Sequence, residues 1–289
     1  MSLLHIAGYE WLDWSAHLDV VLICVLLEGG YLYAVTQMRK GRPDAPPVKQ
    51  RQVVLFTLGV LAIYAAAGSP LHDLAENYLA TAHMLQHVLL TLVAAPLLLA
   101  GVPGWVWQAL LRTPGVMRVA KPMTQPIVAF AIFNAALLLI HLPGTIELQL
   151  REHLFHLLMH AVLVGTALLM WWPILSPIPE LPRLNPPLQM AYLFMQSLLP
   201  AVMASFITFS DTVVYPFYED APRIWNWTAL DDQQVAGCSM KLTGTLILWS
   251  YMTFVFFRWY AQEEAEEQAR QNDAADKDQL EQLDLQRSR

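Results

Sequence analysis

The residues best suited to chemistry in this 289-residue chain are histidines, and five of its nine stand in two groups at helical spacing. His83 and His87 lie four residues apart, so an ideal helix separates their imidazoles by about 40° around its axis and about 6 Å along it. His153, His156 and His160 fall within an arc of about 60° on one helix face. Imidazoles at these spacings can share one metal ion, so the pattern predicts a metal site built from two helices.

Two further histidines stand beside prolines at the predicted ends of neighbouring apolar segments. They are His72, close to Pro70, and His141, close to Pro143. We expect both to act as auxiliary ligands or to line the route by which a metal reaches the site. A purely structural hydrogen-bond network and a proton relay are the other interpretations of the whole set.

Sulfur next to the histidines bears on the identity of the metal. Neutral imidazole binds copper, zinc and iron, and thioether neighbours favour Cu(I). Met84 and Met159 adjoin the histidines in sequence, although adjacent residues point about 100° apart on a helix. A single methionine is more typical of core packing. The pattern favours copper, with zinc, iron and haem as alternatives.

Carboxylates near the predicted helix ends have two interpretations. Asp211 closes the sixth apolar segment, and Asp232 opens the seventh. A carboxylate at the start of a helix commonly caps it. It can also orient a ligating histidine by accepting a hydrogen bond from the second ring nitrogen, and we expect this role for both residues.

The elements that must position these side chains are membrane spans. The chain is 56% hydrophobic and only 14% charged, whereas soluble proteins average about 25% charged residues. This composition excludes a disordered chain, a nucleic-acid-binding protein and a secreted disulfide scaffold. Seven apolar segments are long enough to cross about 30 Å of hydrocarbon as helices. They predict an all-α bundle of seven transmembrane helices near 17–38, 53–69, 77–101, 125–142, 153–173, 187–210 and 233–259.

The distribution of basic residues orients the predicted bundle. The loops on one side contain nine Lys and Arg residues and those on the other side contain two. The positive-inside rule then places the N-terminus outside, the C-terminus inside and all nine histidines in outer loops or outer halves of spans. In a bacterium this predicts a multi-pass protein of the cytoplasmic (inner) membrane. Residues 1–260 form the transmembrane domain, and residues 261–289 form an acidic cytoplasmic tail with nine acids and four bases, expected to extend the last helix into solvent.

Several motifs resemble the multispanning CtaG family of cytochrome c oxidase assembly factors over about residues 55–255. They are SPLH at 69–72, AHMLQH at 82–87, PLLLAGVP at 96–103, HLPG at 141–144, WWP at 171–173, FSDT at 209–212 and DQQVAG at 232–237. The resemblance implies a seven-helix membrane protein that is needed to make an active haem-copper oxidase, through delivery of copper.

The sequence therefore predicts a non-enzymatic assembly factor that binds copper among His83, His87, His153, His156 and His160. It would pass the metal by ligand exchange to a cytochrome c oxidase subunit. Its other partners would be the lipid bilayer and a periplasmic copper donor, with no nucleic acid.

Two alternatives belong to other classes. One is a membrane-embedded zinc- or iron-dependent hydrolase or oxygenase that uses Asp73, Asp211 or Asp232. The other is a b-type haem protein with one histidine ligand from each of two helices, such as His87 and His156.

Overall fold

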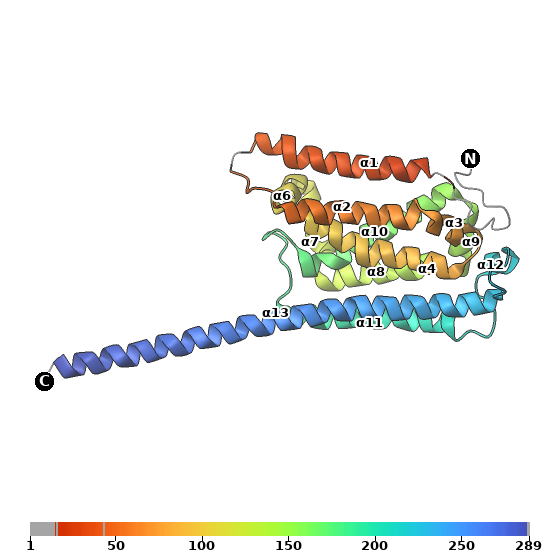
Figure 1. The fold of residues 1–289 in the computed structure, drawn as a ribbon. Coiled ribbons are helices and arrows are strands. Elements are labelled where there is room, and N and C mark those ends of the chain that lie inside the picture. The colour runs from red at the N-terminus through yellow and green to blue at the C-terminus, as the bar shows by residue number, and fades with distance from the viewer. Residues whose placement is uncertain (1–14, 16, 43, 288–289) are drawn as a thin grey trace.

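The computed structural model describes residues 15, 17–42 and 44–287, which fold into helices joined by short loops (Figure 1). His5 lies outside the described residues. Six helical stretches are long and apolar enough to cross a membrane. They are built from α1 (Leu18–Tyr33) with the π-helical turn η2 (Ala34–Met38), α2 (Gln50–Ala67) with α3 (Pro70–Asn77), α4 (Ala80–Val88) with η3 (Leu89–Ala94) and α5 (Ala95–Gly101), α10 (His153–Leu175), α11 (Pro186–Thr208) and α13 (Ala229–Arg287).

The fourth predicted span differs from a straight helix. It consists of α7 (Pro114–Met123) and α8 (Pro126–Ile140), which bend by 80° where they meet. At 1.5 Å per residue, the 15 residues of α8 rise about 22 Å, which is less than the hydrocarbon thickness. Within the part of the chain that the structure describes, the bundle has six candidate spans, or seven if this bent pair counts as one. The short helices α6 (Gly104–Leu111), α9 (Pro143–Arg151) and α12 (Pro216–Asp220) complete the fold.

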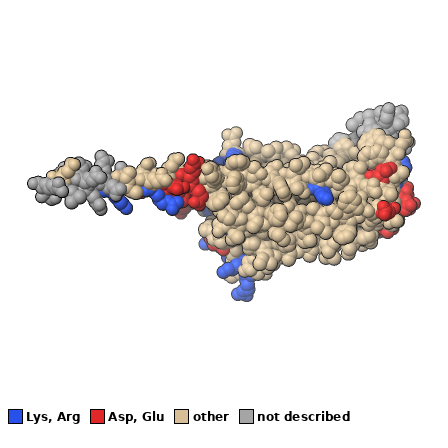
Figure 2. Space-filling view, turned by 90° about the horizontal axis from the view of Figure 1, so that it is seen from below, with Lys and Arg blue, Asp and Glu red and all other residues tan. Residues whose placement is uncertain are grey.

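The prediction of an all-α membrane bundle is confirmed, whereas the orientation in the membrane and the boundary at residue 260 stay predictions. On the face shown in Figure 2, charged side chains gather at the two ends of the bundle and leave an almost entirely uncharged middle. We call the end that carries α3, α9 and α12 the histidine end, and the opposite end, from which α13 extends, the basic end (Figure 1).

The residues at 69 and 70 explain why the second helical stretch continues past the point where the sequence predicted its end. Ser69 caps a new helix there, since its hydroxyl accepts a hydrogen bond from the Leu71 N–H at 3.2 Å and Pro70 occupies the first helical position. The helix therefore resumes as α3 and continues to Asn77. This extra segment carries His72, Asp73 and Glu76 across the histidine end.

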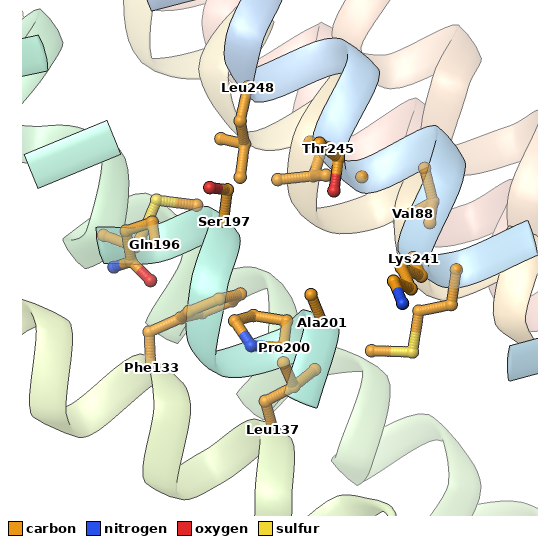
Figure 3. A pocket seen from close by; sticks show the side chains of 14 residues that line it. Val88, Phe133, Leu137, Gln196, Ser197, Pro200, Ala201, Lys241, Thr245 and Leu248 are labelled. Carbon is orange, nitrogen blue, oxygen red and sulfur yellow. The ribbon is translucent and has the colours of Figure 1, made fainter. Parts of the chain in front are cut away.

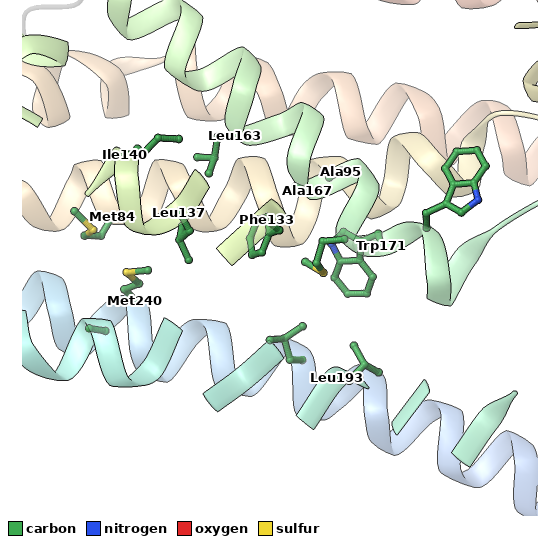
Figure 4. Close-up of a cluster of buried hydrophobic side chains, with 14 of the residues drawn as sticks. Met84, Ala95, Phe133, Leu137, Ile140, Leu163, Ala167, Trp171, Leu193 and Met240 are labelled. Carbon is green, nitrogen blue, oxygen red and sulfur yellow. The ribbon is translucent and has the colours of Figure 1, made fainter. Parts of the chain in front are cut away.

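Buried apolar side chains from α4, α8, α10, α11 and α13 form the main core (Figure 4). Trp171 and Leu193 are fully buried in it. Small residues let the helices approach closely: a Cβ on Gly237 would lie 2.7 Å from the Ala204 carbonyl oxygen, so α11 and α13 pack almost backbone to backbone.

Helix α1 lies at one edge of the bundle (Figure 1). It packs on α2, where the Tyr31 and Phe56 rings stack at 4.0 Å and the Tyr31 hydroxyl donates to the Gly101 carbonyl. In its apolar window 28% of the residues are buried, against 61% for the span that begins with α4.

Candidate metal centre

Six buried histidines from four segments meet at the histidine end of the bundle. None of them is more than 6% exposed. They are His72 on α3, His83 and His87 on α4, His141 directly after α8, and His156 and His160 on α10.

Four of these imidazoles form a closed ring, which we call the histidine quartet. The ring centres of His83 and His87 are 4.5 Å apart, and those of His156 and His160 are 4.3 Å apart. Across the two helices, His83 and His156 are 5.6 Å apart and His87 and His160 are 6.0 Å apart. Four imidazoles around one tetrahedral metal ion have ring centres roughly 5 Å apart, so the quartet has the size of a single metal site.

An aspartate from the last span positions the α4 pair. The N-cap residue of α4, Leu79, offers no capping side chain. Instead Asp232, fully buried on α13, accepts hydrogen bonds from the backbone N–H groups of Ala80 at 2.6 Å and Thr81 at 3.1 Å. The expectation that Asp232 orients a histidine directly is thus replaced by a different role: it caps the helix that carries His83 and His87.

Glu76 is a central residue of the site that the sequence analysis missed. Its Oε1 atom lies 3.2 Å from His72 Nε2 and 2.6 Å from His156 Nδ1. The second contact is an ion-pair approach whose angle departs from that of a linear hydrogen bond. The four-residue spacing from His72 was a signal in the sequence that a helix would place both side chains on one face.

Gln86 fixes the protonation of His72. Its Nε2 atom lies 2.7 Å from the Ala66 carbonyl oxygen and 2.8 Å from His72 Nδ1. A carbonyl can only accept, so the amide nitrogen must face it, and His72 Nδ1 must be an acceptor. The proton of neutral His72 is then on Nε2, facing Glu76, so both ring nitrogens of His72 have hydrogen-bonding partners in this arrangement.

The same reasoning leaves His87 with a free basic nitrogen. His141 Nδ1 donates to the Leu137 carbonyl at 2.7 Å. Neutral His141 therefore presents an unprotonated Nε2, which accepts a hydrogen bond from His87 Nδ1 at 3.1 Å. The Nε2 atom of His87 is left unprotonated, buried and without a hydrogen-bond partner.

The other members of the quartet also present nitrogens that a metal could use. Both ring nitrogens of His83 are buried without a hydrogen-bond partner. His156 Nε2 and His160 Nε2 face each other at 3.0 Å. Two nitrogens bound to one ion lie about 2.9–3.4 Å apart, so this pair has a separation typical of shared ligands.

The arrangement is not yet that of a bound metal. Within the described ranges, no group of three or more His, Cys, Asp or Glu side chains has the geometry needed to hold a metal ion. The rings make contacts with one another instead, as the His156–His160 approach illustrates. Metal binding by the quartet therefore requires ring rotations that turn its nitrogens toward a common centre.

Other predicted site residues lie away from the quartet. His153 is 60% exposed, and its ring contacts Asp19 of α1 at 2.9 Å. Asp211 is exposed in the loop after α11. Met84 is fully buried in the apolar core (Figure 4), and Met159 packs at the edge of that core.

A cavity of about 50 Å³ lies beside the site, lined by Val88, the residue after His87, and by Lys241 (Figure 3). The Lys241 ammonium donates to the Ser205 hydroxyl at 3.2 Å. This cavity thus has one charged side chain, Lys241, among mostly apolar walls.

The fold and the site define a multi-pass membrane protein with a buried histidine cluster. The profile of one family, described as cytochrome c oxidase caa3 assembly factor (Caa3_CtaG), matches residues 29–262. The chain belongs to this family, which confirms the resemblance and extends it into the first span. No curated protein and no solved structure matched the chain in the same comparisons.

Proposed function

We propose that this protein binds copper in the histidine quartet and passes it to a cytochrome c oxidase subunit while the oxidase is assembled. Membership in the assembly-factor family supports the oxidase as the destination. The observation that carries the copper proposal is the convergence of four buried imidazoles, of which His83 and His87 present three ring nitrogens without a hydrogen-bond partner. The protein acts here as a carrier and catalyses no reaction of its own.

The energetic argument rests on His83 and His87. A buried polar group without a hydrogen bond costs roughly 1–3 kcal/mol in proteins. Three ring nitrogens of these two residues are in that condition. Polar groups inside a membrane protein are expensive and usually functional. One metal ion would bind one nitrogen of each of the two imidazoles and so satisfy two of these three atoms.

The donor set also suits temporary binding. The quartet contains neutral imidazoles and no thiolate, so it binds copper without the very high affinity of cysteine-rich sites. The adjacent carboxylate of Glu76 contacts His156 Nδ1 and would leave Nε2 free for the metal. A site of this kind can hand over its metal when a partner offers competing ligands.

We further propose that the histidine end faces the outer side of a bacterial cytoplasmic membrane. The nine-to-two distribution of basic residues between opposite loops supports this orientation. In this arrangement the quartet lies on the side where a periplasmic copper donor could reach it. The acidic tail would then extend into the cytoplasm.

The direct experiment is metal analysis by mass spectrometry of detergent-purified protein. Wild type is expected to contain close to one copper per chain, and the double variant His83→Ala, His87→Ala is expected to contain almost none. His153→Ala is the matched control, because this exposed histidine lies outside the quartet. Unchanged copper in the double variant would refute the site. Zinc or iron in place of copper would favour the hydrolase or oxygenase alternative.

A further inference from the structure

A further imidazole–carboxylate pair, formed by His17 and Asp73, lies between the protein surface and the quartet. His17, which precedes α1, places Nε2 at 3.3 Å from Asp73 Oδ1 on α3. The other carboxylate oxygen of Asp73 accepts from the Ser15 N–H at 3.1 Å. The side chains of His17 and Asp73 are 11% and 12% exposed. They are therefore closer to solvent than the fully enclosed His83.

This pair is in contact with the interior through His72. The rings of His17 and His72 meet edge to face with centres 4.5 Å apart. His72 in turn contacts Glu76 at 3.2 Å, and Glu76 contacts His156 of the quartet at 2.6 Å. Imidazole and carboxylate groups thus follow one another without a break from the surface to the quartet.

We infer that His17 and Asp73 form a shallow copper site that passes the metal through His72 and Glu76 to the quartet. This inference rests on the proposed function, because it concerns how the same metal enters and leaves. At the shallow site the metal takes the place of the hydrogen between His17 Nε2 and Asp73 Oδ1, and neutral His17 carries its proton on Nδ1 instead. His72 and Glu76 then serve as successive ligands, each of which is in contact with the next.

The burial of the quartet is the reason for such a relay. His83, a member of the quartet, is fully buried, so an ion cannot reach it from water in one step. A bare ion in a low-dielectric interior is very unfavourable unless ligands accompany it. Contacts of 3.3, 3.2 and 2.6 Å between polar atoms, joined by the 4.5 Å contact between the His17 and His72 ring centres, keep the next ligand close before the previous one is released.

The test is the time course of copper transfer to and from full-length protein, with a coloured Cu(I) chelator as donor and acceptor under reducing conditions. Asp73→Asn and His17→Gln are expected to slow both directions about tenfold or more, equivalent to about 1.4 kcal/mol on the barrier, and to leave the final copper content unchanged. Asp19→Asn is the matched control, because Asp19 also pairs with a histidine but with the exposed His153. It is expected to transfer copper at the wild-type rate.

Each other outcome has a definite meaning. Wild-type rates in both variants would overturn the relay and leave the quartet proposal standing. A lower final content at an unchanged rate would also overturn it, since His17 and Asp73 would then belong to one common site. Failure of wild type to take up copper would refute both proposals. The conservative His17→Gln keeps a hydrogen-bond donor toward Asp73. If it slows copper transfer as much as Asp73→Asn does, the cause is loss of a metal ligand and not loss of folding.

Discussion

Asp232 accepts a hydrogen bond at 2.6 Å from the backbone N–H of Ala80, a residue 152 positions earlier in the chain. The last span thereby caps the helix that carries His83 and His87. Asp232, the first residue of the DQQVAG motif, thus contributes to the site by holding the start of α4 in place and not by contact with a histidine. The predictions below follow from this and from similar contacts.

Asp232→Ala leaves the N–H groups of Ala80 and Thr81 without their acceptor. Loss of a capping carboxylate costs about 0.5–2 kcal/mol, and burial of this one favours the upper part of that range. We expect a clearly lower midpoint of thermal unfolding in detergent and reduced copper content. Asp231→Ala is the control, because its exposed carboxylate caps only its own helix through Thr228. Equal destabilisation by both substitutions would contradict the role assigned to Asp232.

Glu76→Gln removes the charge shared by His72 and His156. The carboxylate favours a protonated Nδ1 on His156 and so keeps Nε2 available for metal. Loss of such an orienting group commonly weakens metal affinity about 10- to 100-fold, and we expect an effect of this size in competition titrations with a chelator. Glu147→Gln, at an exposed ion pair with Arg151, should leave the affinity unchanged. An affinity unaffected by Glu76→Gln would remove Glu76 from the site.

His141→Ala tests the hydrogen-bond chain that leaves His87 Nε2 free. Without the acceptor at His141 Nε2, His87 can place its proton on either nitrogen, and part of the population loses its ligand atom. We expect copper affinity to fall about tenfold, with binding retained, whereas His87→Ala should abolish binding. Chelator competition on both variants measures the difference. Complete loss of binding in His141→Ala would instead identify His141 as a ligand.

Gly237→Ala tests the close packing of α11 against α13. The added methyl would lie 2.7 Å from the Ala204 carbonyl oxygen, so the helices must separate at a cost of about 1–3 kcal/mol. Gly244→Ala in the same helix is the control, since its nearest neighbour would be a Leu92 methyl at an ordinary 3.7 Å. Thermal unfolding should distinguish the two variants. Identical unfolding midpoints would mean that the bundle repacks without strain.

Local helix geometry accounts for what the sequence predicted well. The spacing of His83 with His87 and of His156 with His160 follows from 3.6 residues per turn, whatever surrounds the helix. The apolar segments likewise predict spans because the hydrocarbon thickness sets their length. Both predictions need no knowledge of how helices pack.

The remainder of the site depends on packing, which spacing does not encode. His153 lies on the same helix face as His156, but it is the first residue of α10 and reaches outward to Asp19. Glu76 joins the site only because a new helix, α3, begins after Ser69. This helix places the Glu76 carboxylate beside His156 of α10. Asp232 lies in the first turn of α13 but caps α4, and only the assembled bundle brings these two helices together.

The most direct test of the central claim is X-ray absorption spectroscopy at the copper edge on copper-loaded protein. The account predicts imidazole nitrogens as ligands at roughly 2.0 Å, with the strong outer-shell scattering of histidine rings and no sulfur ligand. His83→Ala should lower the number of imidazole ligands. A sulfur ligand, or a spectrum unchanged by loss of His83, would contradict a copper site in the histidine quartet.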